Sequence, residues 1–170
     1  MMNIYCLLNE SEKKGLAEIL DGSAPPFDWN GDIRNVSSGF YTRFDSPYEN
    51  QPEIPETFIM FEKLGEDHYE MSFAVNEDDK QAFQSDMPYY LRIVSTLLLI
   101  IRKFIKLHDT QTLNVVGVDK SNVRNPGQKN RIYFSIIEKN APSLGYEYGH
   151  GKNEITMFKL PRKPYIKPKI

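Results

Sequence analysis

At 170 residues, with 40% hydrophobic and 12% aromatic side chains, the chain has the composition of one packed domain and not of a disordered polymer. Its lone cysteine, Cys6, excludes an intramolecular disulfide framework, and its first residues lack the features of a secretion signal, so we expect a cytoplasmic protein. The net charge of −2 conceals a division, because residues 1–86 carry 18 acidic and 6 basic side chains whereas residues 87–170 carry 5 acidic and 15 basic ones.

The first elements that we expect are a strand at residues 3–8 and a helix at residues 9–20. Residues 21–57 hold five of the eleven prolines, so this region is expected to be largely irregular, with one strand at residues 38–45. Aromatic side chains are frequent there, and we expect them to plug the core, that is, to pack into it, in preference to anchoring an interface. They are Phe27, Trp29, Phe40, Tyr41, Phe44 and Tyr48.

A β-hairpin is predicted next, from residues 56–64 and 68–76 joined around Gly65. In its second strand Tyr69, Met71, Phe73 and Val75 alternate with polar or small residues. This period of two predicts one buried face and one face in contact with water.

A long apolar helix is predicted at residues 88–108. Apolar residues recur at helical spacing in two stripes, the second of which includes Phe104 and Leu107, and so wide a band implies cover on more than one side. The uncharged run between Arg92 and Arg102 is far shorter than the roughly 20 residues of a membrane span, so we interpret it as core.

The remaining elements alternate. We expect a central strand at residues 112–118, a helix at about residues 126–140, a hairpin from residues 146–151 and 154–160, and an extended basic tail at residues 161–170. The predicted fold is one α+β domain, residues 1–160, in the order β-α-β-β-β-α-β-α-β. Its sheet is mixed and mainly antiparallel, with two or three helices packed mainly on one face.

Residues 68–160 resemble a family of small uncharacterised tailed-bacteriophage proteins. The resemblance is carried by the alternating strand from Tyr69 to Val75, the run 94–105, the strand 113–118, the run 129–133, residues 144–146 and the strand 155–160. The chain departs from the family at Lys129, where an arginine is usual, and residues 1–67 have no counterpart. The resemblance implies an α+β fold and a phage context, and it brings no known activity.

A basic loop at residues 119–131 is the first candidate contact. Lys120, Arg124, Lys129 and Arg131 stand against one acidic residue, between a strand end and a helix start, where free backbone N–H groups favour anions. The loop either contacts phosphate, nucleic acid or a partner, or is a solvated loop whose bases pair with the acidic half of the chain.

The basic tail is the second candidate. Arg162, Lys163, Lys167 and Lys169 are interleaved with prolines and no acidic residue. Such a segment can hold an acidic surface or a phosphate backbone, and it can equally wrap along this protein's own acidic strands.

No other pattern indicates a site. The acidic loop at residues 76–86 lacks the glycine and spacing of a calcium loop, and the three histidines are too dispersed for zinc. The run from Gly145 to Gly151 indicates a hairpin turn, in which exposed Tyr146, Tyr148 and His150 would form a binding edge. We expect no catalytic residue, metal or cofactor.

We therefore expect a phage-type intracellular protein that acts by binding a protein partner, without catalysis. Binding of nucleic acid through residues 119–131 and the tail is the first alternative, and a structural or assembly role in a virion is the second; a homo-oligomer is compatible with each. The charge division discriminates among these functions. If acids and bases interdigitate, the asymmetry is internal, whereas separate faces indicate a docking surface.

Overall fold

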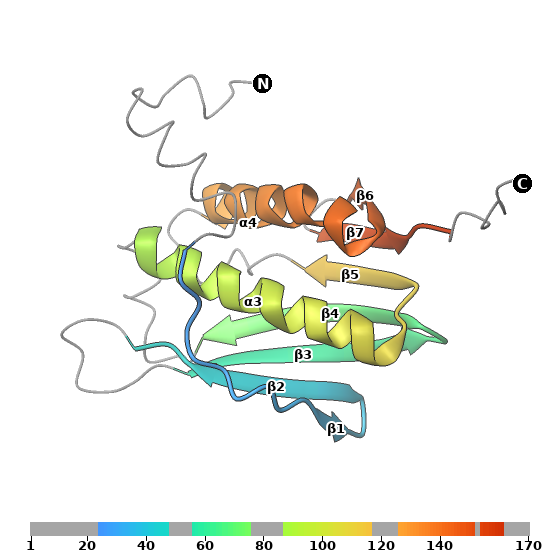
Figure 1. The fold of residues 1–170 in the computed structure, drawn as a ribbon, viewed down its shortest axis with the longest axis horizontal. Coiled ribbons are helices and arrows are strands. Elements are labelled where there is room, and N and C mark those ends of the chain that lie inside the picture. Colours follow the sequence, from blue (N-terminus) through green and yellow to red (C-terminus); the bar gives the residue numbers. More distant parts are fainter. Residues whose placement is uncertain (1–23, 48–55, 76–86, 117–125, 152–153, 162–170) are drawn as a thin grey trace, which may run out of the picture.

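The computed structural model describes residues 24–47, 56–75, 87–116, 126–151 and 154–161. They form one seven-stranded sheet in the order β1-β2-β3-β4-β5-β7-β6, with two helices layered on it (Figure 1). In chain order the elements are β1 (Arg34–Val36), β2 (Gly39–Asp45), β3 (Glu56–Gly65), β4 (His68–Val75), α3 (Met87–His108), β5 (Thr112–Val116), α4 (Pro126–Asn140), the 3-10 helix η4 (Pro142–Leu144), β6 (Tyr146–His150) and β7 (Glu154–Lys159).

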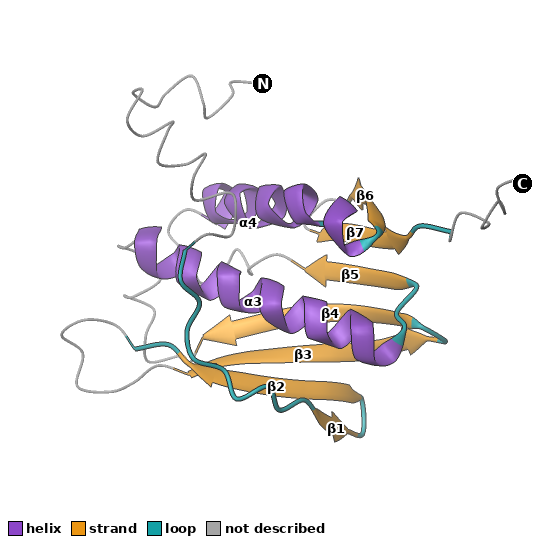
Figure 2. Ribbon diagram, in the orientation of Figure 1, coloured by secondary structure: helices purple, strands orange, loops and turns teal. Residues whose placement is uncertain are grey.

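The sheet is mixed and mainly antiparallel, as predicted. Only β4 and β5 run parallel, and α3 makes the crossover between them. Both helices lie on the same face of the sheet (Figure 2). The α+β fold class is therefore confirmed.

Two short elements were not predicted. β1 consists of three exposed residues, of which Arg34 pairs with Tyr41 of β2. A strand of three residues is too short to show a period. η4 has Pro142 in its first turn and ends at Gly145, whose φ of 82° is left-handed. The predicted strand at residues 3–8, helix at residues 9–20 and acidic loop at residues 76–86 lie outside the described residues.

Helix α3 is the centre of the core. Its residues Ile93, Val94, Leu97, Ile100, Ile101 and Phe104 are fully buried. The prediction for Leu107 was wrong, because this side chain is 59% exposed. The place over the sheet at this end of α3 is taken by His108, whose ring lies 4.0 Å from that of Phe40.

An aromatic cluster joins α3 to the sheet. The ring of Phe104 stacks on Phe61 of β3 at 3.7 Å between centroids and meets Tyr69 edge-on at 5.1 Å. Phe40 closes the cluster at 5.6 Å from Phe104. Burial beside these rings lowers the pKa of His108, because the charged imidazolium loses hydration there.

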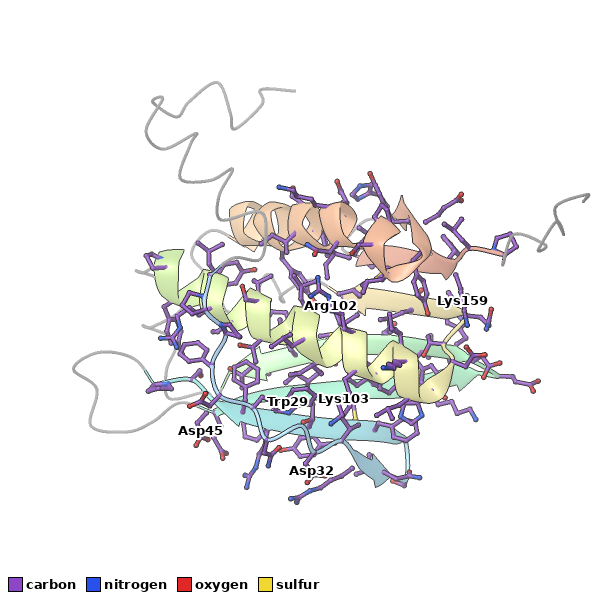
Figure 3. All side chains as sticks on the ribbon, in the orientation of Figure 1. Trp29, Asp32, Asp45, Arg102, Lys103 and Lys159 are labelled. Atoms are coloured by element: carbon purple, nitrogen blue, oxygen red, sulfur yellow. The ribbon has the colours of Figure 1, made fainter. Side chains whose placement is uncertain are left out.

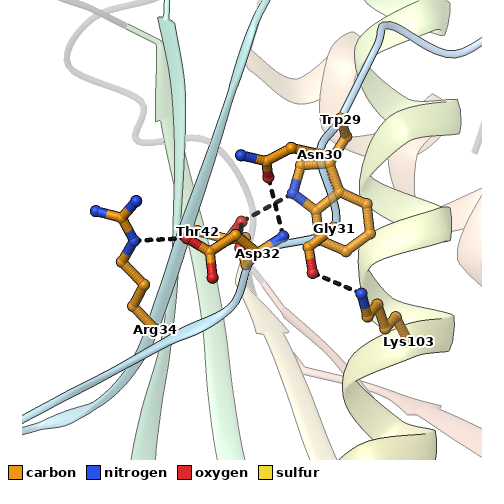
Figure 4. A network of polar contacts seen from close by, with 7 residues as sticks. All are labelled: Trp29, Asn30, Gly31, Asp32, Arg34, Thr42 and Lys103. Carbon is orange, nitrogen blue, oxygen red and sulfur yellow. Dashed lines mark hydrogen bonds and ion pairs between the residues drawn. The ribbon is translucent and has the colours of Figure 1, made fainter.

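Residues 24–33, which we name the strap, run along one flank of α3 (Figure 1). The backbone N–H of Phe27 donates to Thr96 Oγ1 at 2.9 Å, and Arg92 Nε donates to the carbonyl of Pro25 at 3.0 Å. Further along, Lys103 Nζ donates to the carbonyl of Gly31 at 2.6 Å (Figure 4). The strap is thus held mainly by hydrogen bonds between its own backbone groups and side chains of α3.

The other flank of α3 faces α4, where Arg102 donates to Asn140 Oδ1 at 3.0 Å. Sheet, strap and α4 together explain the wide apolar band, and cover on more than one side is confirmed. The expected aromatic plugs are also found: Phe27 and Phe44 are buried, and Trp29 and Phe40 pack against the core. Tyr41 instead stacks on Phe58 at 6.2 Å, and Tyr48 lies outside the described residues.

Replacing Thr42 by valine is expected to destabilise the strap. Thr42 Oγ1 accepts a hydrogen bond from Trp29 Nε1 at 2.9 Å and donates one to the carbonyl of Asp32 at 2.5 Å (Figure 4). Valine keeps the shape and leaves both partners unpaired, at a cost of about 1–3 kcal/mol. Because Trp29 is the chain's one tryptophan, urea unfolding followed by its fluorescence measures the loss, with Thr156→Val as the control. An unchanged midpoint would mean that water replaces these bonds freely.

Candidate functional site

The predicted basic contacts lie almost wholly outside the described residues. These residues are Lys120, Arg124, Arg162, Lys163, Lys167 and Lys169. Lys129 and Arg131 fall within α4, and their side chains are not described. In the sequence, Lys120 and Arg124 come after the end of β5 at Val116 and before the start of α4 at Pro126. The role of this basic loop as a contact stays a prediction.

The described residues leave one face of the sheet without cover. On β3, Thr57, Ile59 and Phe61 are buried under the helix layer, so Phe58, Met60 and Glu62 point to the opposite side. The same alternation holds along β2, β4, β5 and β7. We name the side opposite α3 and α4 the open face.

The open face is acidic. Among the described residues it carries two basic side chains, Arg34 and Arg43, and six carboxylates: Asp45, Glu56, Glu62, Glu70, Glu147 and Glu154. Arg43 is already paired with Glu56, at 3.0 Å between guanidinium nitrogen and carboxylate oxygen. The face therefore has a strong surplus of negative charge.

A row of polar side chains crosses this face. Glu62 on β3 stands directly opposite Glu70 on β4, and the register continues through Asn114 on β5 to Thr156 on β7. Two like charges in directly opposed positions destabilise an antiparallel pair. A cation at this point of the row would relieve that repulsion.

Apolar side chains lie beside the acids on the open face. Phe158 is 47% exposed, and Phe58 and Met60 are half-buried. Aromatic and methionine side chains within a polar surround are typical of protein interfaces. The open face thus combines charge with contact area.

The helix layer has the opposite balance. Its described bases are Arg92, Arg102, Lys103, Lys106 and Lys139, and Figure 3 labels Arg102 and Lys103 on this side. The described acids on this side are Glu138 on α4, Asp109 directly after α3, and Asp28 and Asp32 of the strap. Acidic side chains therefore prevail on the open face, and basic side chains prevail on the helix layer.

The ion pairs agree with this sorting. Arg34 pairs with Asp32 at 2.7 Å and Arg43 with Glu56, both within the acidic half. In the basic half His150 Nε2 lies 2.6 Å from Glu138 Oε1, and Lys159 pairs with Asp109. Between described residues, these pairs join groups of the same half, so the charge asymmetry is not consumed by pairing across the halves.

The glycine-rich run of residues 145–151 belongs to β6 and its flanks. The hairpin is confirmed, with its turn closed by the bond from Gly151 N–H to the carbonyl of Glu154 at 2.9 Å. The predicted binding edge was wrong for Tyr146, which is buried and whose hydroxyl donates a hydrogen bond to the carbonyl of Thr110. Burial raises the pKa of Tyr146 to about 12. Tyr148, at 43% exposed, and His150 remain accessible.

Two further polar features carry no site. A small hollow at the β1–β2 end of the sheet is lined by Asp32, Arg34 and Arg43, whose charges are already paired. Arg34 donates a hydrogen bond to the Asp32 carboxylate, and this bond raises the pKa of Arg34 above its usual value. Within the described residues no group of histidine, cysteine or acidic side chains is placed to hold a metal ion.

The open face was missed in the sequence. The alternation in residues 68–76 predicts a face in contact with water, but the pairing of Glu62 with Glu70 depends on a register shift between Lys63 and Gly65.

Comparison with protein-family models, with curated proteins and with solved structures found no match. No described helix is both long enough and apolar enough to cross a membrane.

Proposed function

We propose that this protein acts by binding a partner protein, and that the open face of the sheet receives a basic surface of that partner. The observation that carries the proposal is the sorting of charge, with six carboxylates and two guanidiniums described on the open face and most other described bases on the helix layer. Complementary potential of this kind raises the association rate and selects among partners.

A protein is favoured over nucleic acid as the partner. Phosphate would be repelled by the open face, and the bases of the helix layer are partly engaged within the molecule. Arg92, Arg102 and Lys103 each donate a hydrogen bond to the strap or to α4. Exposed Phe158 adds an aromatic contact that a protein surface can cover.

The proposal includes no catalytic step. The resemblance to small tailed-bacteriophage proteins makes an intracellular phage or host protein the class of partner to test first. A virion component is distinguished by fractionation, because it would travel with purified particles.

Reversing the charge of Glu70 is expected to weaken binding of a basic probe by roughly tenfold, since a close attraction becomes a repulsion. The probe is a fluorescent ten-residue peptide of alternating lysine and tyrosine, titrated by anisotropy. Asp28→Lys is the matched control, because it changes the net charge equally on the exposed strap. It is expected to leave the affinity within about twofold.

Salt provides the second measurement on the same samples. Affinity of the native chain should fall steeply as ionic strength rises, because exposed charges are screened over about 8–10 Å at physiological salt. Equal weakening by Glu70→Lys and Asp28→Lys would show that the probe responds to net charge alone, and the open face would then not be its site.

A further inference from the structure

The described chain ends near the row of Glu62, Glu70, Asn114 and Thr156 on the open face, which we name the acidic row. β7 ends at Lys159, and Leu160 N–H is held by the carbonyl of Gly145 at 2.9 Å. The register places Phe158 beside Thr112, and Thr112 beside His68. The start of the tail is therefore at the same end of the sheet as the N-termini of β5 and β4.

Acidic side chains are close to this exit of the tail from the sheet. Glu147 stands opposite Phe158 in the β6–β7 pair. Glu70 lies two residues into β4 from His68, and Glu62 is its partner on β3. On the open face, Glu147 is thus the carboxylate nearest to the exit, and on the helix side it is Asp109, which is paired with Lys159.

The tail is long enough to reach all of them. Residues 162–170 span at most about 30 Å when extended. From β7 to β3 there are three strand spacings, or roughly 14 Å. The tail holds four bases and no acid, and its two prolines restrict its freedom before any contact forms.

We propose that the chain's own tail, residues 162–170, occupies the acidic row from Glu62 to Thr156 and competes there with the basic partner. The competition between tail and partner rests on the proposed function, whereas the occupancy of the acidic row by the tail does not. The tail's cations meet the opposed carboxylates of Glu62 and Glu70, and its Tyr165 and Ile166 supply apolar side chains for the area around Phe158. Tail and partner then exclude each other from the open face.

The expected degree of occupancy follows from the covalent attachment of the tail to the domain. A short flexible connection gives an effective concentration in the millimolar range. A tail peptide that binds in trans with a dissociation constant of about 0.1 mM would therefore occupy the face roughly nine-tenths of the time when attached. Occupancy of that degree weakens a competing partner about tenfold.

Paramagnetic broadening tests the occupancy in the full chain. A nitroxide is attached through Ile170→Cys in a Cys6→Ser background, and amide signals are recorded by NMR. Broadening is expected at Glu62, Glu70 and Asn114 and not at Leu99, which is exposed on α3. The same label in a chain with Arg162→Gln, Lys163→Gln, Lys167→Gln and Lys169→Gln should lose the effect.

Two results would overturn this inference. One is broadening confined to the end of β7 or spread over the helix layer. The other comes from a mixed sample, in which one chain carries the nitroxide but no isotope and a second chain carries the isotope but no nitroxide. Broadening that persists in this sample would mean that the tail binds a second copy of the chain.

The lysine–tyrosine probe separates this inference from the proposed function. Binding about tenfold tighter to the four-glutamine variant than to the native chain supports both. Equal binding to the two chains overturns the competition and leaves the function standing. If neither chain binds the probe, the proposed function fails, and broadening at Glu62 and Glu70 decides the occupancy alone.

Discussion

Replacing Phe104 by alanine is expected to lower the free energy of unfolding by about 3–5 kcal/mol. The Phe104 side chain is fully buried, stacks on Phe61 at 3.7 Å and meets Tyr69 and Phe40 edge-on. Alanine removes both the buried area and four ring contacts, the fourth being with His108 at 4.6 Å between centroids, and the sheet beneath cannot collapse into the space. Domains of this size are stable by about 5–15 kcal/mol, so the variant would lose a large part of its stability.

Urea unfolding followed by circular dichroism measures the effect. Leu99→Ala is the matched control, because Leu99 lies on the same helix and is 39% exposed. It should change the stability by less than about 1 kcal/mol. Similar losses from Phe104→Ala and Leu99→Ala would contradict the placement of α3 on the sheet.

Replacing Gly39 by alanine is expected to cost about 3 kcal/mol or more, from backbone strain and steric overlap together. Gly39 has a φ of 150°, and a Cβ at this position would lie 2.0 Å from the carbonyl oxygen of Phe61. That oxygen belongs to the neighbouring strand, so the overlap is relieved only by separating β2 from β3. Hydrogen exchange at Tyr41 and Met60, which pair across these strands, would report the separation.

Gly145→Ala is the control for backbone conformation alone. Its φ of 82° is also positive, but nothing lies within 4 Å of a Cβ built there. A loss of about 1–2 kcal/mol is expected. If Gly39→Ala costs no more than Gly145→Ala, the close approach of β2 to Phe61 is wrong.

The elements that the sequence predicts well are those with a clear period. The alternation from Tyr69 to Val75 and the helical stripes of residues 88–108 depend only on which face is buried, and both elements are found with small changes at their ends. β1 and η4 escaped because three residues are too few to show a period.

The strap and the open face depend on contacts far apart in the chain. Phe27 and Thr96, which hydrogen-bond, are 69 positions apart, and no local pattern records such a pair. The acidic row likewise requires the order of the strands, since Glu70 and Asn114 become neighbours only through the parallel pairing of β4 and β5. Composition along the chain showed the charge division, but the fold was needed to show that acids prevail on one face and bases on the other.

The most direct test of the central claim is NMR mapping of the lysine–tyrosine peptide on the isotopically labelled chain with its four tail bases replaced by glutamine. The amides of Glu62, Glu70, Asn114 and Thr156 are expected to shift together on titration, and those of Leu99 and Lys103 to stay in place. Shifts confined to the helix layer, or none on the open face, would contradict the assignment of that face as the site of partner binding.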